Sequence, residues 1–244
     1  MKAYLAKHYL LEVNLLREQV ESFDLCPFML PAVRHLDSIE LHPAVTFLIG
    51  ENGSGKSTLL EAIAIAAGFN PEGGTRNFRF ATRASHSDLH QYLRLVRGPR
   101  RPKDGFFLRA ESFFNVATEI ENLGVGVAYG QRSLHEQSHG ESFMALILER
   151  FRGNGLYFLD EPEAALSPSR QLALLSRLHD LVEDASQFVI ATHSPIVMAY
   201  PNARILHLGE TGIAEVAYRD TEHFRVTREF LANPNRMLKI LMEP

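Results

Sequence analysis

Residues 50–58 constrain the fold of this chain more than any other stretch, because they carry a complete phosphate-loop pattern: a glycine, four further residues, and then Gly-Lys-Ser. The glycines allow backbone conformations that a Cβ atom would forbid, so successive N–H groups can surround a phosphate. The apolar run 45–49 predicts a buried strand before the loop, and residues 58–67 predict a helix whose N-terminus faces the anion. A glycine-rich turn before a helix is the simpler alternative, but this strand and helix favour a nucleoside triphosphate site.

The residue types within this loop have separate chemical tasks. The ammonium group of Lys56 is expected to reach the β- and γ-phosphates, and the hydroxyl of Ser57 is expected to ligate Mg²⁺. The loop therefore predicts a bound nucleoside triphosphate together with Mg²⁺. All of its residues are candidates for nucleotide contact: Gly50, Glu51, Asn52, Gly53, Ser54, Gly55, Lys56, Ser57 and Thr58.

The composition is that of a globular protein, with 45% hydrophobic and 22% charged residues. A chain of 244 residues can bury the core of one large domain or at most two small ones, and we expect a single domain over residues 1–244. The one cysteine, Cys26, cannot form an internal disulfide, and no apolar run reaches the ~18 residues of a membrane span. We therefore expect a cytoplasmic protein without an integral membrane segment.

Apolar segments follow one another as strand, helix, strand, helix and strand, which predicts an α/β fold with a mostly parallel core sheet. Antiparallel strands are expected near residues 1–44 and 90–110. In the second of these regions, residues 92–97 and 106–109 are expected to form a hairpin. The connection between them, 98–105, is rich in glycine and proline and would be its exposed tip.

Three further elements are expected in the second half of the chain. Ser167 and Pro168 are the residue types of an N-cap and a first helical turn, so a helix is expected to begin there. A hairpin is expected around residues 210–212 and a helix near 221–231. The helix after Pro168 is expected to bury one apolar face: Leu172, Leu175, Leu178 and Val182.

The apolar run 156–159 ends in two adjacent carboxylates, Asp160 and Glu161. In phosphate-loop enzymes an acid at the C-terminal end of such a strand meets the magnesium ion, and a second acid can remove a proton from the attacking water. Two such acids would repel each other strongly without a cation, so their pairing favours a site for Mg²⁺. The alternative is a strand that runs into a polar turn, and the phosphate loop makes this the weaker reading.

A further motif lies in a region, about residues 112–152, that is expected to contain a loop followed by a helix over 142–151. Residues 137–142 resemble the signature loop of the ATP-binding cassette (ABC) superfamily, in the form that ends in glutamate. The positions divide into matches and departures: Ser138, Gly140 and Glu141 match this form, whereas Gln137 and His139 depart from it.

Two more motifs follow in the order that this superfamily has. Residues 163–168 stand where the family has its D-loop, with Ser167 in place of the usual aspartate. His193, directly after the apolar run 188–191, falls at the position of the switch histidine. From about residue 45 to His193, the chain resembles the nucleotide-binding domain of an ABC-superfamily ATPase.

The resemblance implies a phosphate-loop NTPase of the ABC type with an additional antiparallel β subdomain, and it implies ATP and Mg²⁺ as cofactors. It also implies an ATP-dependent homodimer in which two subunits lie head to tail. The matching signature residues would contact the nucleotide that the other subunit's phosphate loop holds. Glu161 would take a proton from the attacking water, His193 would stabilise charge on the γ-phosphate, and Lys56 would hold the phosphates.

Two functional positions of the family have no plain counterpart in the sequence. For the glutamine that senses magnesium, Glu111 is the candidate metal ligand and Gln131 is the alternative. Phe23 and Phe28 are candidates for stacking on adenine, although a phenylalanine in this region is more often part of a hydrophobic core.

The chain most resembles small stand-alone AAA-type ATPases related to SMC and RecF proteins, since its signature and the segment 160–168 depart from the transporter form. Only residues 59–137 separate phosphate loop and signature, without sustained heptads, so no coiled-coil arm is expected. The expected function is a molecular switch that hydrolyses ATP and acts on DNA or a DNA-associated complex. The alternatives are the ATP-hydrolysing subunit of a membrane transporter and a nucleotide-sensing module with little turnover.

A basic segment over residues 76–109 is the candidate nucleic-acid contact in a chain whose net charge is −4. It contains only two acidic residues, and aromatic residues are interleaved with the basic ones. The alternative is a solvated basic hairpin that keeps a sheet edge soluble. The basic residues are Arg76, Arg79, Arg83, Arg94, Arg97, Arg100, Arg101, Lys103 and Arg109.

Overall fold

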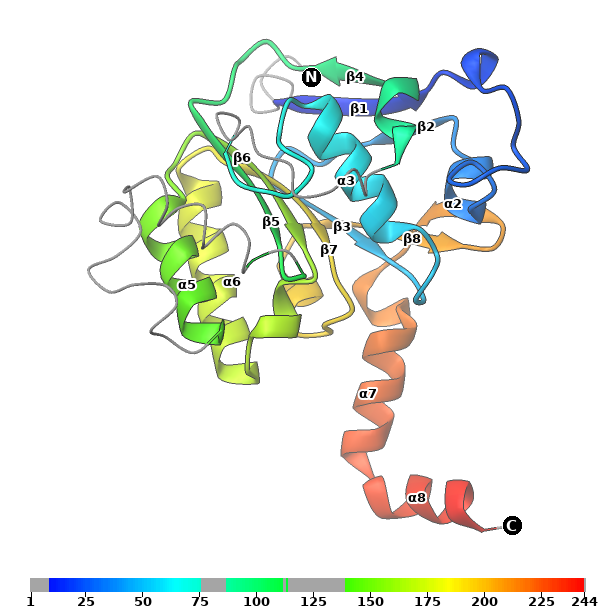
Figure 1. Cartoon of the computed structure of the whole chain (residues 1–244). Helices are drawn as coiled ribbons and strands as arrows, with labels where there is room; N and C mark the ends of the chain where they lie inside the picture. The colour runs from blue at the N-terminus through cyan, green and yellow to red at the C-terminus, as the bar shows by residue number, and fades with distance from the viewer. Residues whose placement is uncertain (1–8, 76–86, 112, 114–138, 244) are drawn as a thin grey trace.

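The computed structural model describes residues 9–75, 87–111, 113 and 139–243. Its central element is a six-stranded sheet with the strand order β5-β6-β7-β3-β8-β9 (Figure 1). All neighbouring strands in it are parallel except β8 and β9, which form the hairpin predicted around residues 210–212. The strands are β3 (Val45–Ile49), β5 (Asp104–Arg109), β6 (Gly155–Asp160), β7 (Gln187–Ala191), β8 (Arg204–Gly209) and β9 (Gly212–Glu215). The predicted α/β fold with a mostly parallel sheet is confirmed.

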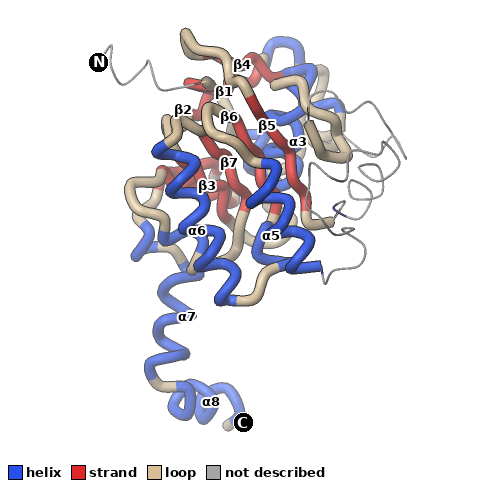
Figure 2. Tube along the Cα trace, turned by 90° about the vertical axis from the view of Figure 1, so that its left-hand side faces the viewer, coloured by secondary structure: helices blue, strands red, loops and turns tan. Residues whose placement is uncertain are grey.

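Helices cover both faces of this sheet, which explains why its central strands read as unbroken apolar runs. Every residue of β3, β6 and β7 is buried. Helix α3 (Lys56–Ala66) lies on one face, whereas α5 (His139–Arg150) and α6 (Pro168–Glu183) lie side by side on the other (Figures 1 and 2). The buried side chains accordingly form two clusters, one on each side of the sheet.

A second sheet, with strand order β2-β1-β4, packs beyond α3 (Figure 1). Its strands β1 (Leu10–Leu15), β2 (Ser38–Glu40) and β4 (Leu93–Arg97) are antiparallel, as predicted for the additional subdomain. The buried side chain of Gln187 joins the two sheets, because its amide accepts from the backbone N–H of Leu10 at 2.9 Å and donates to the Leu10 carbonyl at 2.8 Å. A short helix, α2 (Pro31–Arg34), lies between β1 and β2 in the chain.

The hairpin predicted from residues 92–97 and 106–109 is wrong. Strand β4 pairs with β1 in the antiparallel sheet, whereas β5 pairs in parallel with β6 in the central sheet. The reason is burial, since Phe106, Phe107 and Leu108 are all 0% exposed and thus need cover on both faces of their strand. The connecting segment passes from one sheet to the other, and its prolines, Pro99 and Pro102, lack the N–H groups that a ladder requires.

Helix α6 begins at Pro168 as predicted, and the predicted apolar face is confirmed in part: Leu178 is buried, and Leu175 and Val182 pack against the core. Its buried residues include Leu174, Leu178 and Leu181, whereas Leu172 is 60% exposed. The polar residue Gln171 shares the buried face because its amide donates to the Leu166 carbonyl at 3.0 Å and accepts from the Ser194 hydroxyl at 2.6 Å. Ser167 is the N-cap residue, although its side chain makes no capping hydrogen bond.

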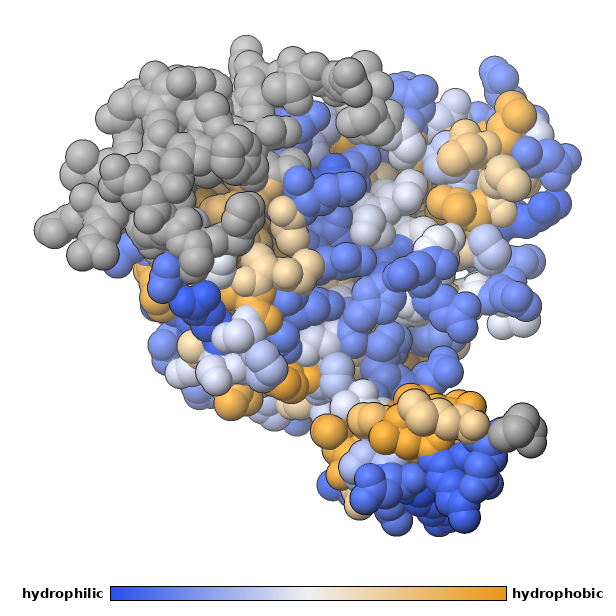
Figure 3. All heavy atoms as spheres, turned by 60° about the horizontal axis from the view of Figure 1, so that its bottom comes forward, coloured by the Kyte–Doolittle hydropathy of each residue, from blue (hydrophilic) through white to orange (hydrophobic). Residues whose placement is uncertain are grey.

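The C-terminal helices α7 (Glu222–Ala232) and α8 (Pro234–Met242) project away from the sheet (Figures 1 and 2). The helix predicted near residues 221–231 is therefore confirmed. Neither helix has a buried residue, and an apolar surface on them is visible in Figure 3. Within the described residues, no helix combines the length and the apolar character needed to cross a membrane. The exposed apolar residues of this arm are Val226, Leu231, Ile240, Leu241 and Met242.

Candidate active site

The phosphate-loop pattern lies between β3 and α3, so the predicted strand–loop–helix unit is confirmed. Gly50 has φ 151°, and a Cβ atom there would lie 2.4 Å from the Leu208 carbonyl oxygen. Gly55, directly before α3, has φ 96°, in the left-handed region that disfavours other residues. The loop backbone thus has a shape that requires glycine, with its N–H groups close to the start of a helix.

Lys56 is 4% exposed, and its Nζ donates to the carbonyls of Gly50 at 3.0 Å and Glu51 at 2.9 Å. Burial lowers the pKa of Lys56, while the nearby carboxylates of Glu161 and Asp160 raise it. The loop carbonyls offer this buried ammonium group only partial negative charge. A bound polyphosphate would give it a full negative charge to pair with. Its contact with a nucleotide stays a prediction.

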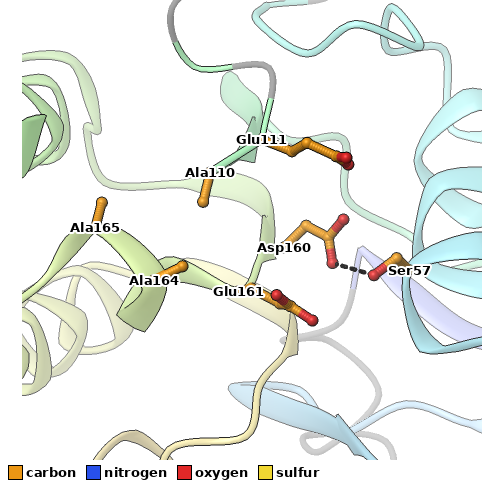
Figure 4. Close-up of a pocket in the computed structure, with 7 residues that line it drawn as sticks. All are labelled: Ser57, Ala110, Glu111, Asp160, Glu161, Ala164 and Ala165. Atoms are coloured by element: carbon orange, nitrogen blue, oxygen red, sulfur yellow. Dashed lines mark hydrogen bonds between the residues drawn. The ribbon is translucent and has the colours of Figure 1, made fainter. Parts of the chain in front are cut away.

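The hydroxyl of Ser57 donates to Asp160 Oδ1 at 2.9 Å, which brings together the two side chains predicted to ligate Mg²⁺ (Figure 4). The Asp160 side chain is 7% exposed, and burial raises its pKa to about 6. Burial is the largest cause of this value; the carboxylates of Glu161 and Glu61 also contribute to the rise in pKa, and the Ser57 hydroxyl and Arg109 oppose it. A proton and a cation therefore compete for this carboxylate near neutral pH.

This pair of oxygen donors fits Mg²⁺. The ion prefers hard oxygen ligands and is usually held by one or two side chains together with substrate phosphates, without a dedicated cage. The described residues contain no group of three or more His, Cys, Asp or Glu side chains placed to hold a metal ion. Ser57 and Asp160 line one cavity of ≈ 510 Å³ (Figure 4), whose other lining residues are Ala110, Glu111, Glu161, Ala164 and Ala165.

Glu161 lines this cavity immediately after β6. Its backbone takes a left-handed conformation, φ 49°, and its side chain is 41% exposed. The carboxylate Oε1 lies 3.6 Å from Nε2 of His193, so the structure brings together the two residues predicted to act on the attacking water and the γ-phosphate. A carboxylate that is open to solvent and faces the cavity can reach a water molecule there.

His193 follows β7, and a residue that the sequence analysis did not single out fixes its backbone. Glu163 Oε1 accepts from the N–H groups of His193 at 2.5 Å and Ser194 at 3.1 Å. Burial raises the pKa of Glu163, whereas burial and the charge of Lys56 lower the pKa of His193. The His193 ring also contacts His223 from α7, with Nδ1 and Nε2 3.1 Å apart. No local motif around residue 223 indicates this contact.

Glu111, the candidate magnesium-sensing residue, lines the same cavity as Ser57 and Asp160 (Figure 4). Its side chain is 90% exposed and lies 3.7 Å from the guanidinium of Arg109. The alternative, Gln131, lies outside the described residues. Phe28, a candidate for adenine stacking, belongs to the hydrophobic core at 9% exposure, with Phe23 packed against its cluster.

The signature segment is described in part, since Gln137 and Ser138 lie outside the described residues. Gly140 is buried in the first turn of α5, where a Cβ atom would lie 2.6 Å from the Ala165 carbonyl oxygen. Glu141 pairs with Arg170 on α6 at 3.1 Å. Gly140 and Glu141 are not among the residues that line the cavity at Asp160.

Arg109 was assigned to the basic segment, and the structure corrects this assignment. Its side chain is 16% exposed at the end of β5, and it forms ion pairs with Glu61 of α3 and with Asp160 at 3.6 Å. The partners come from elements that are distant in sequence, so the interpretation by local charge missed them. Arg109 thus belongs to the group of charges around the candidate metal site.

The comparisons with known proteins agree with this geometry. An AAA-domain family model matches residues 26–150, just over half of the chain, and a second AAA-domain model matches residues 128–199. The chain is 27% identical over 171 residues to ABC transporter G family member STR2 of Medicago truncatula, and 25% identical over 186 residues to the arabinose import ATP-binding protein AraG of Ralstonia nicotianae.

These matches cover 62% and 67% of this chain but only 24% and 36% of the respective relatives, so the chain spans a minor part of their length. Among solved structures, cbiO1 from Clostridium perfringens, part of the ABC transporter complex cbiONQ, matches with a TM-score of 0.50 and 16% identity. The match covers 97% of this chain and 100% of that one, which shows a shared fold over almost the whole chain.

Proposed function

We propose a function from the family of this chain, which belongs to the AAA domain family as an ATPase nucleotide-binding domain of the ABC superfamily. The chain binds ATP with Mg²⁺ and hydrolyses the bond to the γ-phosphate at the cavity beside Asp160. One observation carries this proposal. Ser57 and Asp160 share a hydrogen bond of 2.9 Å at the start of the phosphate-loop helix, and Glu161 and His193 face each other next to them.

The residues divide the work of hydrolysis. Lys56 and the loop N–H groups hold the β- and γ-phosphates, and Ser57 with Asp160 would hold Mg²⁺, which neutralises phosphate charge when it is bound. Glu161 takes a proton from the attacking water as its oxygen bonds to the γ-phosphorus, and the bond to the ADP oxygen breaks. His193 stabilises the charge that develops on the γ-phosphate. The products are ADP and inorganic phosphate, and the proton passes from Glu161 to solvent.

We further propose that two copies act head to tail. The support is the resemblance of residues 137–142 to the ABC signature loop, which in that superfamily contacts the nucleotide that the other subunit holds. The N-terminus of α5 would then present N–H groups to the γ-phosphate of the nucleotide that the other copy holds. ATP would join the copies, and hydrolysis would separate them.

The test of the proposed function is ATP turnover with and without Mg²⁺. We expect turnover to require Mg²⁺, and Ser57→Ala to lower it about 10-fold or more, because a metal ligand and its hydrogen bond to Asp160 are lost. Ser176→Ala, an exposed serine on α6, is the matched control and should leave turnover unchanged. Turnover that is absent in the wild type, or insensitive to Mg²⁺, would contradict the proposal.

The target of the switch is a separate question, and the described part of the basic segment favours nucleic acid. Within the described residues, no carboxylate forms an ion pair with the basic residues that remain on and beyond β4, an edge strand of its sheet. Unpaired cations on an exposed edge suit a phosphate backbone. They are Arg94, Arg97, Arg100, Arg101 and Lys103.

Binding of DNA or RNA is therefore expected to weaken steeply with salt. Arg100→Ala combined with Arg101→Ala should reduce the slope of log affinity against log salt by about 2, one unit for each phosphate contact. The matched control combines Arg219→Ala with Arg225→Ala, two exposed arginines elsewhere, and should leave the slope unchanged. An absent or salt-independent shift in retardation assays would remove this proposal.

The same turnover assay separates the other classes of function. Stimulation by liposomes carrying a permease would favour a transport subunit, which is the kind of protein that the relatives' names describe. Dimerisation in ATP with negligible turnover would favour a nucleotide-sensing module. Stimulation by DNA or RNA supports the molecular switch that we propose.

A further inference from the structure

Two histidine rings from distant parts of the chain meet beside the candidate catalytic pair. His193 lies in the turn after β7, and His223 lies in the first turn of α7. Nδ1 of His193 and Nε2 of His223 are 3.1 Å apart, with the ring centres separated by 5.3 Å. Because a nitrogen–nitrogen contact of this length is a hydrogen bond, one ring must donate an N–H and the other must accept it.

The surroundings of the two remaining nitrogens indicate which ring donates. Nδ1 of His223 is buried and has no hydrogen-bond partner among the described residues. If His193 donated to His223, that Nδ1 would carry a hydrogen with no acceptor, and an orphaned buried N–H is the rarer and costlier arrangement. If His223 donates, its Nδ1 is a bare lone pair, and the hydrogen without a hydrogen-bond partner is the one on Nε2 of His193, which is also buried.

The other end of the pair agrees with this direction. With His223 as donor, the neutral ring of His193 carries its hydrogen on Nε2, which lies 3.6 Å from the carboxylate Oε1 of Glu161. An N–H that faces a carboxylate is favourable, whereas a lone pair in that position would be repelled. Burial lowers the pKa of both rings, which supports neutral rings near pH 7.

The fold holds His223 in place although the rest of α7 projects into solvent. Thr221, the N-cap of α7, is 3% exposed; its hydroxyl accepts from the N–H of Phe224 at 3.3 Å and donates to the Tyr218 carbonyl at 2.8 Å. The Tyr218 hydroxyl in turn donates to the carbonyl of Pro195 at 2.8 Å. The first turn of α7 is therefore fixed to the same turn that carries His193.

We infer that His223 is a positioning residue: it donates to Nδ1 of His193 and so holds the ring of His193 with its Nε2–H directed at Glu161 and at the place of the γ-phosphate. This inference rests on the proposed ATP hydrolysis for its effect on rate, but the hydrogen placement itself is independent of that function. The prepared Nε2–H is a donor that needs no reorganisation when charge develops on the phosphate.

The experiment uses full-length protein with ¹⁵N-labelled histidine and reads the tautomer of His193 by two-bond ¹H–¹⁵N NMR correlations, without nucleotide. The resonances of His193 are assigned with His193→Gln. We expect the Nε2–H tautomer in the wild type and a mixture of tautomers in His223→Leu. His223→Gln should retain the wild-type pattern, because its side-chain amide reaches the position of Nε2 and can donate there.

Turnover of ATP by the same variants gives the second readout. His223→Leu is expected to lower kcat about tenfold with KM for ATP unchanged, because only a contact made in the transition state is lost. His223→Gln is expected to keep kcat within about twofold of the wild type. His179→Leu, an exposed histidine on α6, is the control and should change neither readout.

An Nδ1–H tautomer of His193 in the wild type would overturn the inference, and so would an unchanged pattern in folded His223→Leu. If His223→Leu fails to fold, the wild-type tautomer and the His223→Gln pattern still decide it. If the wild type hydrolyses no ATP while the tautomer result is as expected, the proposed function fails and the positioning of His193 stands.

Discussion

Replacing Glu161 with glutamine is expected to lower kcat for ATP by about 10²–10⁴-fold, because an amide cannot accept the proton of the attacking water. The change is nearly isosteric, and the Glu161 side chain is 41% exposed at the edge of the cavity, so the fold should tolerate it. ATP binding should persist, since Lys56, Ser57 and Asp160 are untouched. With hydrolysis blocked, the ATP-bound dimer should accumulate.

The measurement is sedimentation in Mg-ATP beside a single-turnover assay. Wild type should return to monomer as ATP is consumed, whereas Glu161→Gln should stay dimeric. Glu149→Gln, an exposed glutamate on α5, is the matched control and should behave as wild type. Equal monomer fractions for Glu161→Gln and wild type in ATP would contradict the role of Glu161 and the dimer together. If Glu161→Gln is dimeric but hydrolyses ATP at the normal rate, only the proposed role of Glu161 is contradicted.

The parts of the fold that could be predicted are those encoded within a short stretch of sequence. The phosphate loop is such a part, because β3, the glycine-rich turn and α3 are consecutive and each glycine has a backbone reason to be there. The acidic pair at Asp160 is another, since an apolar strand and its terminal carboxylates are adjacent in the chain. The parallel sheet is also predictable, because strands that are buried on both faces read as continuous apolar runs in the sequence.

The errors arise where the environment depends on residues that are far away in sequence. Strand β4 interrupts its apolar residues with arginines and β5 has a continuous apolar run, and their partners, β1 and β6, are distant in sequence. Helix α6 carries leucines on two adjacent faces, so its choice of buried face depends on the sheet and on the polar contact of Gln171 with Ser194. His223 gives no sequence signal, because its partner lies 30 residues away.

Arg109 is the most consequential of these residues, and replacing it with methionine should destabilise the protein by about 3 kcal/mol. The change leaves two carboxylates, Glu61 and Asp160, at 10% and 7% side-chain exposure without their shared cation, and breaking a buried ion pair in this way typically costs 3–5 kcal/mol. The measurement is chemical denaturation at pH 7. Arg204→Met is the matched control, because its partners Glu40 and Glu215 are exposed and such pairs contribute less than about 1 kcal/mol.

Adding Glu61→Gln to Arg109→Met should restore part of the lost stability, because the double variant has one buried negative charge fewer. If Arg109→Met costs no more than Arg204→Met, the buried network does not stabilise the fold. If it costs as much as expected while DNA affinity keeps its salt slope, Arg109 belongs to the site and not to the basic edge of β4.

The pH dependence of the stability of Arg109→Met shows which carboxylate, Asp160 or Glu61, Arg109 mainly stabilises. Arg109 lowers the pKa of Asp160, which burial has raised to about 6, so Arg109→Met should raise that pKa further. A raised carboxyl pKa means that the folded state holds a proton that the unfolded state has released, so stability falls as pH rises through that window. The loss caused by Arg109→Met should therefore be largest above the raised pKa of Asp160 in the variant and shrink as the pH falls towards about 6. The acidic limb of the pH profile of Mg-ATP turnover should also move to higher pH, because only ionised Asp160 can bind the cation. If this limb does not shift although the full loss of stability is observed, the loss is due to Glu61 instead.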